Sequence, residues 1–458
     1  MEKLFVFTLL LMLLVPECLG AETQPNKIKA SLLREDVDFL VRTIEEIHPD
    51  SYTKVSREEF YRAKDKVKSE IRDMDVYQFY NLIAPLVAMI GDAHTAVYPL
   101  RSPGKCFPVP VAVLDEGIFV ARNYTNISAG REILSINGVD SGRLVDAMLR
   151  FVPCERREFG LAQVESNFPF YLYLVLGEID PFTVTFGSDD GTENREIKAS
   201  SPQSYIYPYQ GYERYLRGSG NALPLGNYPY IFTLMNNKTT LLVINSFREG
   251  PYMPWGVFLS GIFSYLKENG IENLVIDIRA NGGGASSMGD ELIDYLTNKP
   301  WTQFGSSRVK YSEQAIAQWQ QSGWYRTRKA GTIESYTGGL EKPSNNSLRF
   351  NGSVYLLTSR FTFSSASSFA AAIKDFNIGT VVGEETGGIF PNFGDVIIFE
   401  LPNSKIKGQC SHKEWHRWND TDPGRGVKPD YEVKPVPEDL ASGRDSALDL
   451  TMKLIAGL

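Results

Sequence analysis

One serine-rich stretch of the sequence could supply a catalytic nucleophile. The segment YLLTSRFTFSSASSFAAAIKDF predicts a strand that ends near Ser359 and a helix that begins near Ser365, so Ser364 would lie at a helix N-terminus. There its hydroxyl could be exposed while the backbone N–H of Ser365 points at a developing oxyanion. The same serines could instead cap the helix. The segment alone leaves both roles open, and a nucleophile would also need a base.

Histidine is scarce, which limits the choice of that base. The 458 residues contain four histidines: His48, His94, His412 and His416. A serine hydroxyl needs a neighbour that accepts its proton near neutral pH, and histidine meets that condition. His94 lies in the segment GDAHT, between Asp92 and Thr95. His48 precedes Pro49, and a residue before proline is disfavoured inside a helix, so His48 is expected to end one.

The other two histidines stand in the segment CSHKEWH and could bind zinc together with Cys410. The zinc-binding motif HExxH requires glutamate directly after its first histidine, and Lys413 stands there instead. We therefore expect an exposed polar strand or loop in this segment rather than a metal site.

Three consecutive glycines form a second candidate element of the site. Gly282, Gly283 and Gly284 follow the apolar run NLVIDIR and precede a predicted helix. Their backbone N–H groups can approach an anion closely, as phosphate loops and oxyanion holes require. No Gly-Lys-Ser/Thr follows the run, and the dinucleotide fingerprint GxGxxG is absent. The run favours an oxyanion hole, or a tight strand-to-helix turn without a catalytic role.

The composition is that of a globular protein of two to three domains. Hydrophobic residues make up 43% of the chain and charged residues 22%, which argues against disorder and against a membrane bundle. The chain has 47 Lys+Arg and 55 Asp+Glu, a net charge of −8, and no long basic run. We therefore expect no nucleic-acid partner.

The N-terminus has the layout of a secretory signal peptide. Lys3 precedes an apolar run at residues 4–15, which is too short to span a bilayer, and a small residue, Gly20, follows. We expect residues 1–20 to be removed near Gly20 and the mature chain to be exported, periplasmic or secreted, without a membrane span. Export permits disulfides, so either one pair plus a free thiol or three buried thiols are expected among Cys106, Cys154 and Cys410.

Two smaller units precede the candidate nucleophile. Residues 21–100 have apolar residues at helical spacing and predict an N-terminal helical domain. Residues 101–200 hold short β-rich runs, among which GREILSINGVDSGRLVDAML predicts a strand, a tight Asn137-Gly138 turn and a helix. That run resembles the carboxylate-binding core of a PDZ domain, where a strand edge accepts a peptide as an added strand. A β-rich domain without peptide binding is the alternative.

The rest of the chain predicts an α/β core. Residues 201–235, rich in Tyr, Gly, Pro and Ser, are interpreted as a linker or lid. From 236 to 458, apolar strands alternate with helices, which is typical of a buried and mostly parallel sheet. The polar stretch at about 302–346 interrupts the alternation and is interpreted as an insertion near the site. Active sites of such sheets gather where strands end, which is where the serine-rich segment and the glycine run lie.

Taken together, these segments resemble the secreted serine peptidases of the tricorn and carboxyl-terminal processing peptidase family. LLVINSF, NLVIDIRANGGG, the serine-rich segment, TVVGEETGG and GRGVKPDYEV occur in the family's order, with GDAHT and SINGVDSGRL upstream. The resemblance covers the chain from about Leu32 to Val433. It implies an α/β core of ββα units like that of the ClpP and crotonase folds, with a PDZ-like β-rich domain upstream.

The resemblance also implies roles for particular residues. The family nucleophile falls on Ser364. One branch of the family uses a lysine base, but its position looks like Ile389 and no lysine occurs between residues 381 and 401, so the base would be His94. The oxyanion hole would consist of backbone N–H groups: Gly283 or Gly284, together with Ser365.

The third member of this triad would be a carboxylate that orients the histidine. The resemblance assigns it to Asp422, with Asp420 in reserve. The sequence departs from the family in three places: the family usually has glutamate in place of Asp422, many relatives have glutamate in place of Ser367, and the tricorn branch often has serine in place of Ala93.

The sequence therefore predicts an exported serine endopeptidase that acts on protein or peptide substrates and could recognise an extended or C-terminal tail. No cofactor or metal ion is expected in the reaction. Two alternatives remain: a catalytically silent peptide- or ligand-binding protein on the same fold, which the departures favour, and a hydrolase of a non-peptide ester or amide.

Overall fold

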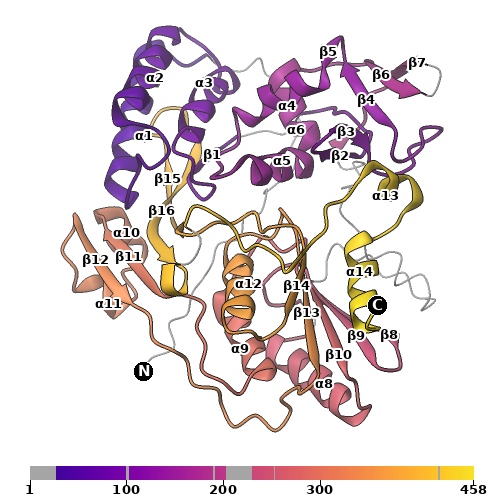
Figure 1. Ribbon diagram of the computed structural model, residues 1–458. Helices are drawn as coiled ribbons and strands as arrows, with labels where there is room; N and C mark the ends of the chain where they lie inside the picture. The colour runs from indigo at the N-terminus through magenta and orange to yellow at the C-terminus, as the bar shows by residue number, and fades with distance from the viewer. Residues whose placement is uncertain (1–26, 100–102, 189–190, 203–228, 252, 421–422) are drawn as a thin grey trace.

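The computed structural model describes residues 27–99, 103–188, 191–202, 229–251, 253–420 and 423–458 (Figure 1). The expected signal peptide, most of the expected linker or lid, and Asp422 lie outside these ranges. Within them the chain forms a helical N-terminal unit, a β-rich unit and an α/β core, in that order. A separate five-stranded sheet joins the first of these units to the last.

The N-terminal unit consists of three helices, α1 (Ala30–Ile47), α2 (Arg57–Glu70) and α3 (Val76–Ala88). α1 ends directly before His48, as the following proline predicts. α2 and α3 each begin with a capping box, at Ser56 and Asp75, which satisfies backbone N–H groups of the first turn. The short strand β1 (Ala96–Tyr98) follows α3, so His94 lies in the loop between them.

The β-rich unit is an antiparallel sheet covered by three helices. Its strands are β2 (Val111–Leu114), β3 (Gly117–Val120), β4 (Glu132–Ile136), β5 (Val139–Asp140), β6 (Phe182–Ser188) and β7 (Gly191–Ile197). They follow the order β2-β3-β4-β6-β7, and β5 pairs with β4. Asn137 and Gly138 have φ angles of 51° and 74°, the left-handed pair that a two-residue hairpin turn requires, so the predicted turn is confirmed. The helices are α4 (Ser141–Leu149), α5 (Arg157–Ser166) and α6 (Phe168–Leu176).

The core contains a six-stranded sheet. Its strands are β8 (Tyr230–Asn236), β9 (Thr239–Ile244), β10 (Asn273–Asp277), β13 (Ser353–Thr358), β14 (Thr380–Gly383) and β17 (Tyr431–Glu432). They follow the order β17-β14-β13-β10-β9-β8, and only β8 is antiparallel to its neighbour. The predicted, mostly parallel sheet is therefore present, although β8 begins at Tyr230, inside the stretch expected to be a linker.

Helices cover both faces of this sheet. They are α8 (Trp255–Glu268), α9 (Ser286–Leu296), α12 (Ser365–Asp375) and α14 (Ser446–Ile455). The short helix α13 (Pro437–Ser442) packs instead against the β-rich sheet through Leu440. Because successive strand residues point to opposite faces, Leu274 and Ile276 of β10 pack in the cluster that holds α8, α9 and α12. Val275 between them packs in the cluster on the other face, with Leu448 of α14. Because both faces of the sheet are buried, the side chains of the central strands are apolar at nearly every position.

The five-stranded sheet attaches the N-terminal unit to the core (Figure 1). Its strands are β1, β11 (Ser306–Tyr311), β12 (Thr332–Thr337), β15 (Asn392–Glu400) and β16 (Lys407–His416). The insertion expected at about 302–346 supplies β11, β12 and two short helices, α10 (Glu313–Gln318) and α11 (Gly323–Arg326). Val309 and Tyr311 of the insertion share one apolar cluster with α1 and α3.

The segment CSHKEWH is not exposed, contrary to the expectation from its composition. It forms the end of β16, and Ser411 and His412 are fully buried. Their polar atoms are paired inside the protein: Ser411 Oγ donates to Asp92 Oδ2 at 2.7 Å, and Tyr325 OH lies 2.6 Å from His412 Nε2. A polar strand can be buried when partners of this kind are available.

The three described cysteines, Cys106, Cys154 and Cys410, are free thiols, two of them buried. The expected alternative of three buried thiols is therefore met in part, because all three are unpaired but Cys154 is only partly buried. Among the described residues, no helix has both the length and the apolar character that a membrane crossing needs.

Candidate active site

Ser364 occupies the sharp turn between β13 and α12. β13 ends at Thr358, at the carboxyl edge of the parallel sheet, and α12 begins at Ser365. Ser364 has φ 53° and ψ −129°, a conformation that residues with a Cβ rarely adopt. The turn is held in place because Thr362 Oγ1 donates to Ile278 O at 3.0 Å, in the loop after β10. Backbone strain at such a position is typical of catalytic sites.

The glycine run lies directly against this turn. Gly283 has φ 106°, and a Cβ there would lie 2.7 Å from the Cβ of Ser364, so no side chain fits. The N–H of Gly283 donates to Asn281 Oδ1 at 2.8 Å. By contrast, the N–H groups of Gly284 and Ser365 form no hydrogen bond with a described residue. Of the two glycines weighed for an oxyanion hole, the geometry therefore favours Gly284, together with Ser365.

His94 meets Ser364 across 270 residues of sequence. Its Nε2 lies 3.1 Å from Ser364 Oγ, within hydrogen-bond distance. The imidazole ring is stacked on Phe363 at 4.7 Å, and Phe363 is stacked on Phe159 of α5 at 4.2 Å. Gln409 of β16 donates to the backbone oxygen of His94 at 3.0 Å. The N-terminal unit, the β-rich unit and the core therefore all contribute to holding this ring.

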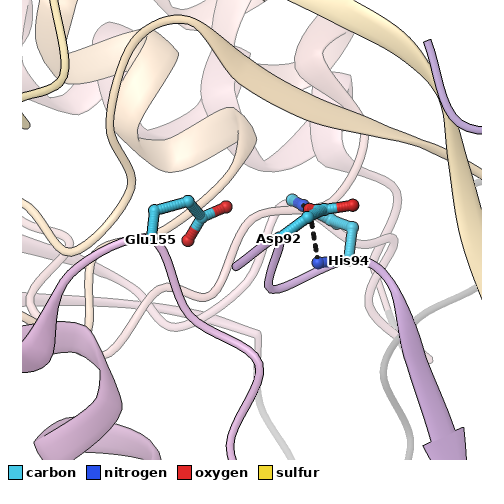
Figure 2. A group of neighbouring side chains, drawn as sticks. All are labelled: Asp92, His94 and Glu155. Atoms are coloured by element: carbon cyan, nitrogen blue, oxygen red, sulfur yellow. Dashed lines mark hydrogen bonds and ion pairs between the residues drawn. The ribbon is translucent and has the colours of Figure 1, made fainter. Parts of the chain in front are cut away.

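A fully buried carboxylate, Asp92, lies beside His94 (Figure 2). It accepts four hydrogen bonds: at Oδ1 from the backbone N–H of His94, and at Oδ2 from Thr95 Oγ1, Ser411 Oγ and His48 Nε2. His48 Nδ1 accepts the backbone N–H of Asp50, so the proton of a neutral His48 ring resides on Nε2. These donors fix the position of the Asp92 carboxylate.

The electrostatics of the pair keep Asp92 charged and His94 neutral before a reaction. Burial is the largest effect and opposes the ionisation of Asp92, but the interactions with His48, His94 and Thr95 together outweigh it and hold the pKa of Asp92 below its usual range. Burial also lowers the pKa of His94, although the charge of Asp92 acts in the opposite direction. Asp92 Oδ1 lies 3.9 Å from His94 Nδ1. A fixed negative charge thus faces a neutral ring that can accept a proton.

A second carboxyl group, Glu155, enters from the segment between α4 and α5 (Figure 2). Its Oε1 accepts the backbone N–H of Ala93 at 3.2 Å. Its Oε2 and the Nδ1 of His94 are buried and have no hydrogen-bond partner among the described residues. Burial, together with the charge of Asp92, raises the pKa of Glu155. An unpaired buried polar atom typically costs about 1–3 kcal/mol, so each of these two atoms would gain from a partner.

Other residues assigned from the sequence lie elsewhere. Asp420 is at the end of a 3₁₀ turn, Trp418–Asp420, with its side chain 73% exposed and its Oδ1 3.1 Å from His416 Nδ1. It makes no contact with His94. Asp422 lies outside the described residues. Ser367 is buried, and its hydroxyl donates to the backbone oxygen of Thr362 within the serine turn.

Two acidic residues of the site were not assigned a role from the sequence. Asp92 stands in the segment GDAHT, and an aspartate two residues before a histidine can accept that histidine's backbone N–H, so the motif could have identified it. Glu155 belongs to no motif. It reaches His94 only because α4 and α5 bring that segment against the N-terminal unit, which no local pattern indicates.

Known proteins match this chain in both sequence and structure. Residues 238–433 match the family described as Peptidase family S41. The tricorn protease of Thermoplasma acidophilum is 26% identical over 191 residues, which cover 40% of this chain and 14% of the tricorn protease. A structure of mature CPAF complexed with lactacystin has a TM-score of 0.70 at 15% identity and covers 93% of this chain and 98% of that one. Mature CPAF alone gives a TM-score of 0.69.

These matches differ in what they cover. The similarity to CPAF shows a shared mixed α/β fold over nearly the whole chain, including the helical and β-rich units. The family match covers the stretch that contains Ser364 and the glycine run, but it does not include His94. The resemblance to tricorn-like peptidases that the sequence indicates is confirmed. Residues 238–433 of this chain are therefore similar to peptidase family S41, and the tricorn protease, of which the chain covers only 14%, is similar to it in sequence.

Proposed function

We propose that the protein is an exported serine endopeptidase that hydrolyses peptide bonds of protein or peptide substrates. The observation that carries the proposal is the 3.1 Å distance between His94 Nε2 and Ser364 Oγ, which is the geometry of a nucleophile beside its base. The family match supports it, because that stretch holds Ser364. We further propose that the core is ClpP/crotonase-like, with a PDZ-like β-rich unit.

In the proposed reaction, Ser364 Oγ attacks the peptide carbonyl carbon while His94 Nε2 takes the hydroxyl proton. The N–H groups of Gly284 and Ser365 bind the oxyanion that forms. His94 then gives the proton to the leaving amine, and a water molecule repeats both steps on the acyl-enzyme. The Asp92 charge stabilises the imidazolium between these proton transfers. Asp422 stays the proposed residue that orients the ring.

Export and tail recognition are further parts of the proposal. The N-terminal sequence supports cleavage near Gly20 and a periplasmic or secreted location. A substrate tail would add as a strand to the β-rich sheet, whose edge strands are β2 and β7. The N–H of Val113 in β2 already donates to Glu165 Oε2 at 2.8 Å, so we propose β7 as the edge that receives the tail.

A catalytically silent binding protein is the second candidate. One observation favours it: His94 Nδ1 has no acceptor among the described residues, whereas a working triad normally fixes the imidazole through that atom. The third candidate, a hydrolase of small esters or amides, would use the same Ser364–His94 pair and differ only in substrate.

A substrate panel separates the three candidates. The mature chain, residues 21–458, should be incubated with an unfolded protein, with peptides and with small activated esters. We expect cleavage of the unfolded protein inside its chain, shown by mass spectrometry of the fragments. Hydrolysis of esters without any peptide cleavage would support the third candidate. No turnover of any substrate would support the silent binding protein.

Replacement of Asp92 by asparagine should lower both activity and stability. The amide keeps the shape of the side chain but removes a charge that, 3.9 Å from His94 Nδ1, is worth about 4 kcal/mol at an effective dielectric constant near 20. We expect kcat to fall about 100- to 1,000-fold. The free energy of unfolding should fall by about 3 kcal/mol, because the amide would present a donor to the donors of His48, Thr95 and Ser411.

The matched control is Asp50→Asn, because Asp50 is exposed and only its backbone contacts His48. This variant should keep kcat and the free energy of unfolding near the wild-type values. Asp92→Asn with an unchanged kcat, measured at a temperature where the variant is folded, would contradict the role of the Asp92 charge.

A further inference from the structure

Three groups that commonly bind transition metals converge beside the serine turn. One ligand atom each from Asp92, His94 and Glu155 lies within 4.8 Å of the other two, and Asp92 Oδ1 is 3.9 Å from His94 Nδ1. Figure 2 shows the Glu155 carboxyl group directed toward the other two side chains. Two residues come from the loop after α3 and the third from the β-rich unit, so tertiary packing brings the three together.

A second observation points to a ligand at this place. His94 Nδ1 and Glu155 Oε2 are both buried, and neither has a hydrogen-bond partner among the described residues. Among the described residues, Asp92 Oδ1 accepts only the backbone N–H of His94, which leaves a lone pair for a further partner. The three residues of this cluster therefore have buried atoms with unused hydrogen-bonding capacity, which a bound cation would satisfy.

The donor set indicates which kind of cation fits. One imidazole nitrogen and two carboxylate oxygens are typical of Zn²⁺, which binds such atoms at about 2.0–2.2 Å in a tetrahedron and can leave a fourth position to water. Mg²⁺ and Ca²⁺ prefer six or more oxygen ligands, and the nitrogen ligand here argues against them. Tetrahedral ligands lie about 3.3 Å apart at these bond lengths, so the 3.9 Å pair must close by about half an ångström. The side chain of Glu155 must also turn, so that its carboxylate comes closer to Asp92 and His94.

We propose that Asp92, His94 and Glu155 form an inhibitory Zn²⁺ site. The inhibition rests on the function proposed above, whereas the binding site does not. A base at Ser364 must have a free lone pair on Nε2, with the single ring proton on Nδ1. Zinc binds through the lone pair of Nδ1, so Nδ1 can no longer carry the ring proton and the single ring proton resides on Nε2. His94 then donates to Ser364 Oγ instead of accepting from it, and the hydroxyl cannot be activated.

Calorimetric titration with ZnCl₂ tests the site independently of catalysis. The protein is the full mature chain with Ser364→Ala, which cannot digest itself. We expect one site of micromolar affinity, weakened at least 10-fold by Glu155→Gln, because an amide oxygen is a poorer zinc ligand than a carboxylate. The amide oxygen can still accept the N–H of Ala93, so the variant should fold, and circular dichroism checks that it does.

Two matched controls exclude other zinc-binding positions. Glu158→Gln removes the same charge three residues along the chain, from an exposed side chain that contacts Arg156. His416→Ala disrupts a surface cluster in which His416 lies 3.2 Å from Glu414 and 3.1 Å from Asp420. Both controls should leave the affinity unchanged. An affinity that is independent of Glu155, or lost with His416, would overturn the site.

Hydrolysis by the wild-type enzyme tests the inhibition. Zinc should reduce turnover at least 10-fold at concentrations that fill the calorimetric site, and a chelator should restore it. Glu155→Gln, compared with its own zinc-free rate, should need at least 10-fold more zinc. Zinc that binds through Glu155 without slowing turnover would overturn the inhibitory role. An absence of turnover in zinc-free protein would instead contradict the proposed function, while the calorimetry would still decide the site.

Discussion

Replacement of Ser364 by alanine should abolish peptide hydrolysis, lowering kcat by about 10⁵- to 10⁶-fold. Without the hydroxyl no acyl-enzyme can form, and only substrate binding and the N–H groups of Gly284 and Ser365 remain to assist water. The fold should survive the change. Alanine keeps the Cβ that already occupies the strained φ of 53°, and the lost hydroxyl has His94 as its hydrogen-bond partner. We therefore expect a Tm within a few degrees of the wild-type value.

The matched control is Ser368→Ala, four residues along the same helix. Ser368 is buried, and its hydroxyl has no hydrogen-bond partner among the described residues, so its removal should change neither kcat nor Tm appreciably. The measurement is the initial rate at which wild-type protein, Ser364→Ala and Ser368→Ala cleave a fluorogenic peptide. Ser364→Ala with a rate near that of Ser368→Ala would show that another residue is the nucleophile.

Replacement of His94 by glutamine should lower kcat by a similar factor, about 10⁴- to 10⁶-fold. Glutamine can place an amide near Ser364 Oγ, but an amide does not accept a proton near neutral pH. Nucleophile and base act as a unit, so their effects should not add. The double variant with Ser364→Ala should be no slower than Ser364→Ala alone.

His416→Gln is the control for the loss of a histidine. His416 contacts Glu414 and Asp420, away from the serine turn, so its replacement should leave kcat near the wild-type value. If His94→Gln kept a tenth of the wild-type kcat, His94 would not be the base. If the kcat of the double variant were lower than the wild-type kcat by the product of the two single effects, the two residues would act independently.

The architecture was largely predictable because its signals are local. Apolar strands such as NLVIDIR alternate with helices, and that alternation predicts a buried parallel sheet whatever the rest of the chain does. The end of α1 before His48 and the turn at Asn137 and Gly138 follow from the backbone preferences of single residues. The two residues of the Ser364–His94 pair are 270 positions apart. The resemblance to the ordered motifs of the family predicts that these two residues pair, whereas their spacing in the sequence does not.

The features that were not predicted depend on long-range pairing. β16 contains CSHKEWH, whose composition indicates an exposed strand, yet Ser411 is buried because Asp92 supplies an acceptor from more than 300 residues away. Glu155 has no local signal, and its position beside Ala93 depends on how the β-rich unit packs against the loop after α3. Polar burial of this kind is decided by partners that a local pattern does not contain.

The site is complete only when three units are in place. The core supplies Ser364, the loop after α3 supplies His94, and the β-rich unit supplies Phe159 behind the aromatic stack and Glu155 beside the ring. A change that loosens the β-rich unit should therefore reduce activity without touching the reacting atoms.

Labelling with a fluorophosphonate tests most directly whether Ser364 is a nucleophile activated by His94. This reagent reacts with an activated serine regardless of the natural substrate, so the result does not depend on finding that substrate. After digestion and mass spectrometry, wild-type protein should carry the adduct on Ser364. Ser364→Ala should carry none, and His94→Gln should react at least 100-fold more slowly. An adduct on another serine, equal labelling of Ser364→Ala, or no labelling of folded wild-type protein would contradict a serine peptidase built on Ser364 and His94.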